Sequence, residues 1–245
     1  MNISNKTILI TGGGSGIGLA AAQLLLEKGN RLIITGRSEA RLQQAVAQLP
    51  GATAIACDLT DAASVANLVS RIEAEFGDLS VLLNNAGQAY AYQLAAGADA
   101  VTKAGEEMAT NYLAVIRLTE HLLPLLSRQP EAAIVNVTSI LAFAPGAYIP
   151  TYSASKAALR SYTQALRHTL AQTTPVKVFE LLPPLVNTDF SAEIGGANGI
   201  SPQQVAAELL AGLEQDTPEI MVGQTAQFYE YHRASPAEAF AALQG

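Results

Sequence analysis

The chain has 245 residues, of which 49% are hydrophobic and 14% are charged, and its formal net charge at pH 7 is −7. That hydrophobic content excludes a disordered chain, and the length is sufficient for one α/β domain with a large core. The acidic balance leaves no uniform basic surface for a nucleic acid. Cys57 is the single cysteine and the three histidines lack ligand spacing, so we expect neither a disulfide within the chain nor a metal site.

Short runs rich in Ile, Val and Leu alternate with longer segments of helical period. This pattern predicts a parallel sheet covered by helices on both faces. We therefore expect one α/β domain over residues 1–245, with a Rossmann-like, doubly wound, mostly parallel seven-stranded sheet. The expected strands are 7–11, 31–35, 52–57, 80–84, 134–138, 176–182 and 220–222, and the longest expected helices are 104–126 and 152–172.

Several helix ends carry recognisable signals. Gly29 and Gly77 follow the first and third expected helices and suit the left-handed backbone that often ends a helix. Thr60, directly before Asp61, is expected to mark the start of the third helix. Ser201 is expected to cap a late helix, with Gln204 in the position that completes a capping box.

The uncharged stretch 7–26 superficially resembles a membrane span or signal peptide. However, five of the seven residues 12–18 are glycine, and this density removes the apolar surface that insertion into lipid requires. We interpret the stretch as a strand, a loop and a helix. The sequence therefore predicts a soluble, cytoplasmic protein without a membrane partner.

Glycines dominate the loop between the first expected strand and helix. Gly12, Gly16 and Gly18 follow a G-x-x-x-G-x-G spacing within the segment 11–18. Such a turn lets the backbone approach a pyrophosphate, and the free amides at the helix start attract its negative charge. A purely structural turn is the alternative.

The end of the second expected strand is where folds of this kind distinguish NAD from NADP. Residues 35–38 contain Arg37 but no carboxylate that would accept the ribose hydroxyls of NAD. The planar guanidinium of Arg37 suits a 2′-phosphate. A solvated arginine is the alternative, although a cation is mildly unfavourable at a helix start. We therefore expect NADP(H) to be preferred over NAD(H).

A second group of polar residues lies near the start of the long helix 152–172. Tyr152 and Lys156 are four residues apart and so share one helix face. Ser139 ends the preceding expected strand, and Asn111 is a polar residue in an otherwise apolar helical run. These four residues form a candidate catalytic constellation.

Together these motifs resemble those of the short-chain dehydrogenase/reductase family, in its shorter single-domain branch, over essentially the whole chain. The resemblance implies an NAD(P)-dependent oxidoreductase that acts on CH–OH groups. The matching motifs are the glycine segment 11–18, Asp58-Leu59, Asn84-Asn85-Ala86-Gly87, and the catalytic positions Asn111, Ser139, Tyr152 and Lys156.

The residues themselves also indicate a chemistry. Hydride transfer to a carbonyl builds negative charge on its oxygen, so a proton donor is needed there. We assign Tyr152 as general acid in reduction and general base in oxidation, and expect the charge of Lys156 to lower the tyrosine's pKa. Ser139 would bond the substrate oxygen. The resemblance implies that Lys156 also holds the nicotinamide ribose and that Asn111 anchors a water relay.

The resemblance also implies which residues bind the cofactor. Asp58 would accept from the adenine amino group, and Leu59 would pack on the ring. The segment 183–188 would face the nicotinamide carboxamide, with Pro184 where the family usually has glycine. The full predicted cofactor set is Gly12, Gly14, Ser15, Gly16, Ile17, Gly18, Arg37, Asp58, Leu59, Asn85, Ala86, Gly87, Tyr152, Lys156, Pro183, Val186 and Thr188.

The loop of about 183–200 is expected to be the mobile lid over the substrate, with Gly195, Gly196 and Gly199 as hinges. The candidate pocket residues are apolar or aromatic, so we expect a small or hydrophobic, uncharged carbonyl or alcohol as substrate. They are Leu141, Phe143, Tyr148, Leu185 and Phe190.

Two other functions are compatible with part of the pattern. A non-catalytic NADP-binding redox sensor would need the glycine turn and Arg37 but not the catalytic constellation. A methyltransferase of similar fold would share a glycine-rich loop but gives no reason for Ser139, Tyr152 and Lys156 together. The family resemblance further implies a homodimer or homotetramer in which the two long helices pack against their copies.

Overall fold

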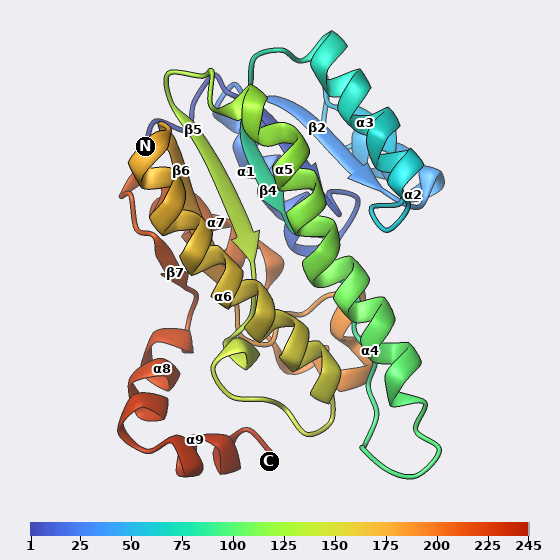
Figure 1. Cartoon of the computed structure of the whole chain (residues 1–245), viewed down its shortest axis with the longest axis vertical. Helices are drawn as coiled ribbons and strands as arrows, with labels where there is room; N and C mark the ends of the chain where they lie inside the picture. Colours follow the sequence, from blue (N-terminus) through green and yellow to red (C-terminus); the bar gives the residue numbers. More distant parts are fainter. Residues whose placement is uncertain (245) are drawn as a thin grey trace.

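The structure is a computed structural model that describes residues 1–244 (Figure 1). Seven parallel strands form one sheet in the order β3-β2-β1-β4-β5-β6-β7, which confirms the predicted Rossmann-like, doubly wound fold. The strand order reverses between β1 and β4, where such sheets bind ligands at their carboxyl edge. The strands are β1 Thr7–Thr11, β2 Arg31–Gly36, β3 Thr53–Ala56, β4 Leu79–Asn84, β5 Ala132–Val137, β6 Val176–Leu182 and β7 Glu219–Met221.

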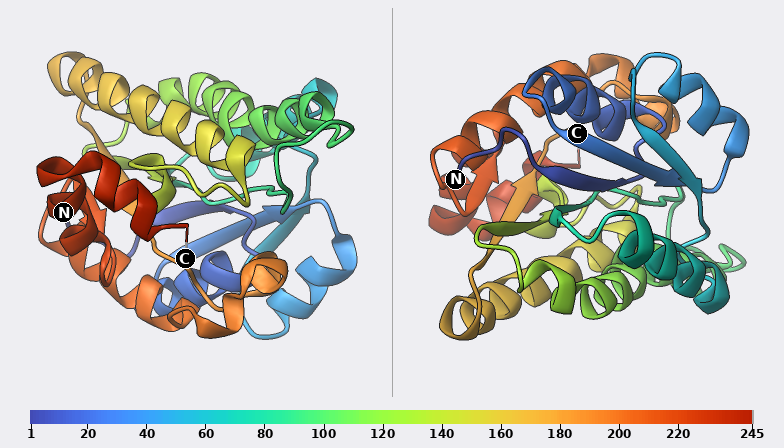
Figure 2. Two further views of the ribbon diagram at one scale, coloured as in Figure 1. Left: turned by 90° about the horizontal axis from the view of Figure 1, so that it is seen from below. Right: turned by 90° about the horizontal axis from the view of Figure 1, so that it is seen from above.

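Helices cover both faces of the sheet (Figure 2). Helices α1 and α7 pack together on one face, and α3, α5 and α6 cover the other. No helix within residues 1–244 is long and apolar enough to cross a membrane. The α-helices are α1 Gly16–Glu27, α2 Glu39–Val46, α3 Ala62–Glu75, α4 Ala100–Met108, α5 Ala114–Leu126, α6 Pro150–Thr173, α7 Pro202–Glu214, α8 Thr225–Ala234 and α9 Pro236–Ala242.

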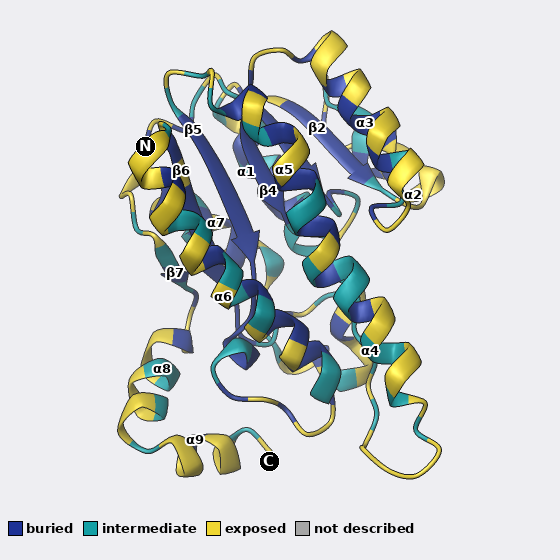
Figure 3. Ribbon diagram, viewed as in Figure 1, coloured by how far each residue is buried: buried dark blue, intermediate teal, exposed yellow. Residues whose placement is uncertain are grey.

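Two hydrophobic cores lie on opposite faces of the sheet. Ile8 and Ile10 of β1 point into one core, and Leu9 between them points into the other. All three are fully buried, and the strands are dark along most of their length in Figure 3. This burial on both faces explains why the strand segments are continuously apolar rather than alternating.

Some helix details differ from the sequence expectation. The expected helix 104–126 begins at Ala100 and is interrupted by a π-helical turn, η1 (Ala109–Leu113). Gly29 has the expected positive φ of 76°, whereas Gly77 has not. Asp61, not Thr60, caps α3, because its carboxylate accepts from an amide in the first helical turn.

The late helix α7 begins as expected, and the hydroxyl of Ser201 accepts from the amide of Gln204 at 3.1 Å. The Gln204 side chain donates to Glu208 at 3.0 Å instead of returning to the cap, so the two residues do not form a reciprocal capping box. A carboxylate one turn along the helix competes successfully for the amide.

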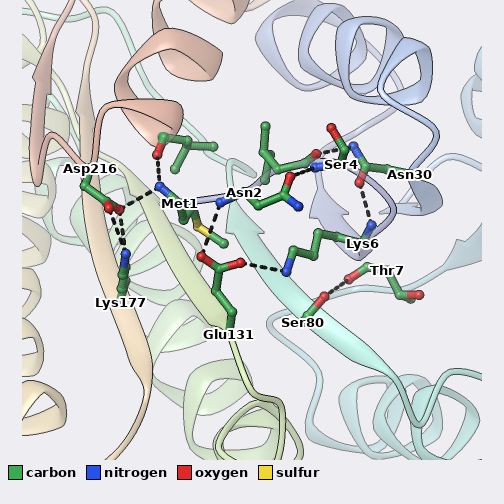
Figure 4. Close-up of polar contacts among 12 residues, drawn as sticks. Met1, Asn2, Ser4, Lys6, Thr7, Asn30, Ser80, Glu131, Lys177 and Asp216 are labelled. Atoms are coloured by element: carbon green, nitrogen blue, oxygen red, sulfur yellow. Dashed lines mark hydrogen bonds and ion pairs between the residues drawn. The ribbon is translucent and has the colours of Figure 1, made fainter.

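Polar residues at the amino edge of the sheet pair with one another (Figure 4). Lys6 and Glu131 form an ion pair at 2.8 Å. Asp216 pairs with both Lys177 and the amino group of Met1, each at 2.8 Å. These contacts join segments that are distant in sequence and close the edge of the sheet that faces away from the carboxyl ends of the strands.

Candidate active site

The glycine turn lies between β1 and α1. Gly12 and Gly16 have φ values of 64° and 53°, in the left-handed region that favours glycine. A Cβ on Gly18 would lie 2.5 Å from the carbonyl oxygen of Gly12, so a side chain cannot be accommodated there. Ser15 at the start of α1 makes no side-chain cap, and the first amides of the helix therefore remain available to an anion.

Residues after β4 and β6 support this turn. The backbone amides of Asn85 and Ala86 donate to the hydroxyl of Thr11 at 2.9 and 3.0 Å. The Asn85 amide group donates to the carbonyls of Thr11 and Gly12 at 3.0 and 3.2 Å. A Cβ on Gly16 would lie 3.1 Å from the methyl group of Thr188. Three strand ends therefore meet at one place.

A separate pocket extends from the glycine turn along the ends of β2 and β3. Arg37 lines it and forms no ion pair with any residue of the described part of the chain. Arg41 and Ser38 line the same pocket, although neither was predicted from the sequence. Arg41 lies in the first turn of α2, only four residues beyond Arg37. This second basic residue at the same helix start is the feature of the sequence that could have indicated its place in the pocket.

Asp58 lines the same pocket, but its carboxylate is partly engaged. Its Oδ1 accepts from the amide and the hydroxyl of Thr60 at 2.9 and 2.7 Å. These hydrogen bonds, with a smaller contribution from the charge of Arg37, hold the pKa of Asp58 below its ordinary value. Leu59 lines the pocket beside it.

Asn111 lies in the π-helical turn η1 and is fully buried. Its side chain accepts from the amide of Gln88 and donates to the Gln88 carbonyl, both at 2.8 Å. It also donates to the hydroxyl of Ser155 on α6 at 2.9 Å. Asn111 therefore fastens the loop after β4 to the helix that carries Tyr152 and Lys156.

The other three candidate catalytic residues line one cavity at the carboxyl edge of the sheet. Ser139 follows β5, and Tyr152 and Lys156 lie in the first two turns of α6. The Nζ atom of Lys156 lies 5.7 Å from the centre of the Tyr152 ring and donates to the carbonyl of Val137 at 2.8 Å. A Cβ on Gly87 would lie 3.9 Å from the same Nζ, so Gly87 leaves the cavity open beside the lysine.

The electrostatics of this cavity differ from the sequence expectation. Burial raises the pKa of Tyr152 above its ordinary value of 10.0; the Ser139 hydroxyl counteracts this and the charge of Glu107 adds to it. Burial also lowers the pKa of Lys156 to about 8. We expected Lys156 to lower the pKa of Tyr152. Here desolvation sets the direction of the shift, and the ammonium group of Lys156 donates to a backbone carbonyl instead of the phenol.

The cavity has a volume of about 300 Å³. Leu141, Tyr148, Leu185 and Phe190 line it, as expected from the sequence, but Phe143 does not. The Phe143 ring turns away to pack against Tyr229, at 4.6 Å between ring centres, and under the guanidinium of Arg160 at 4.5 Å. Several other lining residues were not predicted from the sequence, among them Ile149, Gln224 and Leu243.

Most of the predicted cofactor residues line this cavity or the Arg37 pocket. Gly18 does not, because it lies beneath the turn against Gly12, and Asn111 of the catalytic set also stands behind the cavity wall. Ile17 lines the cavity and also packs against the core. The lining residues of the predicted cofactor set are Gly12, Gly14, Ser15, Gly16, Ile17, Arg37, Asp58, Leu59, Asn85, Ala86, Gly87, Tyr152, Lys156, Pro183, Val186 and Thr188.

The segment 183–200 is more compact than a hinged lid. It contains two short 3-10 helices, η3 (Asp189–Ile194) and η4 (Gly196–Asn198). A Cβ on Gly199 would lie 2.6 Å from the carbonyl oxygen of Leu185, and one on Gly196 would collide with Ser191. Two of the three expected hinge glycines therefore serve close packing. Only Gly195 has a positive φ, of 79°.

The geometry agrees with the comparisons with known proteins. The family model for short chain dehydrogenases matches residues 6–199, and the chain belongs to this family. It is 41% identical over 225 residues to the uncharacterized oxidoreductase DltE of Bacillus subtilis, covering 90% of this chain and 89% of that protein. It is 30% identical over 218 residues to an uncharacterized oxidoreductase of Staphylococcus aureus, covering 87% and 93%.

Solved structures share the same architecture. A short chain dehydrogenase from Burkholderia cenocepacia in complex with NADP superposes with a TM-score of 0.86 at 29% identity, covering 99% of this chain and 98% of that one. A short chain dehydrogenase/reductase from Burkholderia phymatum in complex with NAD gives a TM-score of 0.88 at 22% identity, covering 97% and 96%. The second likeness is evidence for the fold alone.

Proposed function

We propose that this protein is an NADP(H)-dependent oxidoreductase that interconverts a carbonyl and a secondary alcohol by hydride transfer. One observation carries the proposal: Ser139, Tyr152 and Lys156 line a cavity that continues to the glycine turn and borders the pocket of Arg37. The complex of the Burkholderia cenocepacia relative with NADP supports the choice of cofactor. The bound nicotinamide would supply or accept the hydride.

Different residues of the chain are suited to bind different parts of the cofactor. The amides at the start of α1 suit the pyrophosphate, because they carry no side-chain cap. Arg37, with Arg41 and Ser38 beside it, suits the 2′-phosphate of NADP. Asp58 and Leu59 line the same pocket and are suited to the adenine.

Each polar residue at the cavity has its own role in the proposed reaction. The Ser139 hydroxyl orients the substrate oxygen, and Tyr152 donates the proton to it in reduction or removes it in oxidation. The raised pKa of Tyr152 means that its phenol is protonated at neutral pH, which is the form that donates a proton in reduction. Lys156, with a pKa of about 8, exists in both charge forms near neutrality and can exchange a proton with the site. Asn111 positions these groups through Gln88 and Ser155.

The substrate is an uncharged, predominantly apolar carbonyl compound or alcohol. Leu141, Leu185 and Phe190 supply an apolar lining around the phenol of Tyr152, and no arginine or second lysine joins Lys156 among the residues that line the cavity. A carboxylate or phosphate on the substrate would therefore lose hydration without gaining a cationic clamp. Residues 183–200 form the cover of this cavity.

We further propose that the enzyme works in the cytoplasm as a homodimer or homotetramer. Leu113 is 51% exposed beside Tyr112, whose ring meets Tyr162 of α6, so an apolar strip is available for a second copy. Light scattering at micromolar concentration tests this assembly, and a purely monomeric protein would contradict it. Recovery in a salt-washed membrane fraction would contradict the compartment.

The first test is a thermal-shift titration with NADPH, NADP, NADH and NAD. A ligand at about 100 times its Kd adds about 2.7 kcal/mol to the free energy of unfolding. We expect a large shift with the phosphorylated pair and a small one with the other two. Consumption of NADPH with a panel of apolar ketones then tests the reaction, and no consumption despite tight binding would favour a redox sensor.

A further inference from the structure

The end of the chain contributes to the substrate cavity. Helices α8 and α9 follow β7 and lie at the carboxyl edge of the sheet (Figures 1 and 2). Leu243, just beyond α9, lines the cavity and packs against the apolar cluster that contains Tyr152 and Leu141. Phe228 of α8 packs against the same cluster from the side. Leu243 thus completes one wall of the cavity although it lies far beyond Tyr152 in the sequence.

Gln244 fastens this wall to the loop that leads into α6. Its Oε1 accepts from the amide of Ala147 at 2.7 Å, and its Nε2 donates to the carbonyl of Pro145 at 3.0 Å. On the other side of the loop, the carbonyl of Tyr148 accepts from the amide of Tyr92 at 2.8 Å. The loop is therefore held between the chain end and the segment after β4.

Apolar surface continues on the far side of this wall. A groove there shares Tyr148 with the substrate cavity but not Leu243. Leu94 and Phe240 line the groove and are 67% and 42% exposed. Leu243 lines the cavity and the adjacent Gln244 lines the groove, so the end of the described chain lies between the two spaces.

We propose that Leu243 determines substrate length and that Gln244 is the positioning residue that holds it in place. The wild-type enzyme accepts a short apolar carbonyl compound and discriminates against chains that extend into the groove. The inference rests on the proposed function, because it concerns the substrate of that same site. Leu243 and Gln244 would then determine substrate specificity without taking part in the catalytic reaction.

The test compares wild type, Leu243→Ala, Leu243→Phe and Gln244→Ala. kcat/KM with NADPH is measured for the straight-chain methyl ketones 2-butanone, 2-hexanone, 2-octanone and 2-decanone. Each methylene newly buried is worth about fourfold in kcat/KM. Leu243→Ala should therefore shift the preferred length upward by at least one member of the series, Gln244→Ala should do so less, and Leu243→Phe should shift it downward.

Leu210→Ala is the matched control, because Leu210 on α7 is also partly buried but packs against the other core and lines neither the cavity nor the groove. Its ketone profile should equal that of wild type even if its stability falls. A length profile that is unchanged in all three wall variants would overturn the proposal. Gln244→Ala and Leu243→Phe keep the test decisive if Leu243→Ala fails to fold.

A binding measurement separates this proposal from the proposed function. The stabilisation by 2-decanone is measured by thermal shift for wild type and Leu243→Ala. If no ketone is reduced by any of the proteins, the proposed reaction is wrong, but stronger stabilisation of Leu243→Ala than of wild type by 2-decanone still supports the role of Leu243 in limiting substrate length. Equal stabilisation of the two proteins contradicts that role, whatever the kinetics show.

Discussion

Among the described residues, charged groups are ion-paired at the amino edge of the sheet, whereas at the carboxyl edge a buried lysine is not. At the amino edge, Lys6 pairs with Glu131, and Asp216 pairs with Lys177. At the carboxyl edge, Lys156 is buried without an ionic partner within the described chain. A buried lysine costs stability unless its charge is compensated, whereas paired surface groups cost little.

We infer from this contrast that the carboxyl edge retains polar groups for a ligand rather than for folding. The amino edge completes its interactions within the chain, as Figure 4 illustrates for Lys6 and Asp216. The carboxyl edge keeps glycine amides, Arg37 and the phenol of Tyr152 available to small molecules. Changes at the carboxyl edge should therefore affect binding and turnover, and changes at the amino edge should affect only stability.

The largest expected effect comes from Tyr152→Phe, which removes the proposed proton donor and keeps the ring. Proton transfer by a positioned side chain contributes about 10²- to 10⁴-fold, so turnover with NADPH and an apolar ketone should fall by that factor. NADPH affinity, measured by thermal shift, should stay within twofold. Retention of more than a tenth of the wild-type turnover would falsify the role of Tyr152.

The second effect concerns the pocket at the end of β2. Arg37→Asp should weaken NADPH binding by about ten- to a hundredfold, since a hydrogen bond to a charged group is worth about 1.5–3 kcal/mol. NADH affinity should change little. The matched control is Arg128→Asp, which alters the net charge equally at a residue lining neither pocket. Equal loss of NADPH affinity in both variants would attribute the effect to long-range charge alone.

Much of the fold was predictable because its strands are buried on both faces. Continuous apolar runs such as Ile8 to Ile10 are typical of strands in a parallel sheet covered on both sides, and the structure contains all seven expected strands. The π-helical turn was not predictable. It accompanies hydrogen bonds from Asn111 to Gln88 and Ser155, which come from other elements and leave no trace in the local periodicity.

The site residues that belong to short sequence motifs were predictable. The site residues whose position depends on tertiary packing were not. The glycine turn and the set of Ser139, Tyr152 and Lys156 have characteristic spacings. Phe143 was misjudged because its direction depends on Arg160, and Leu243 was missed because its contacts come from the folded chain end. The pKa of Tyr152 was misjudged for a related reason, since a neighbouring charge can be inferred from spacing but the extent of burial cannot.

A smaller effect concerns pH and Glu107, a fully buried residue of α4 beside the loop after β4. Burial raises its pKa above the ordinary value of 4.5, although hydrogen bonds from Thr151 and the amide of Tyr90 oppose the rise. The folded state therefore prefers the protonated carboxyl. The stability that this group contributes is fully present below pH 4.5 and is lost as the pH rises through its raised pKa.

Glu107→Gln keeps an acceptor for the Tyr90 amide and removes the titration. Urea unfolding at pH 4.5 and 7.5 should show a smaller loss of stability on raising the pH in this variant than in wild type. Glu120→Gln, at an exposed position of α5, is the control and should follow the wild-type dependence. Parallel pH dependences for wild type and Glu107→Gln would contradict the buried titration.

The smallest effect is expected at the amino edge, with the opposite dependence on pH. The hydrogen bond from Lys6, ahead of smaller contributions, holds the pKa of Glu131 below its ordinary value of 4.5. The stability it contributes is present above pH 4.5 and is lost as the pH falls through the lowered pKa. Glu131→Gln should therefore lower the free energy of unfolding at pH 7 by at most about 1 kcal/mol.

The difference between Glu131→Gln and wild type should shrink in acid, whereas that between Glu107→Gln and wild type should grow with rising pH. NADPH affinity and turnover of Glu131→Gln should equal those of wild type, because the ion pair lies at the edge of the sheet remote from the cavity. A loss of turnover in this variant without a loss of stability would mean that the two edges are coupled. The division of the molecule into a self-paired edge and a ligand-binding edge would then be wrong.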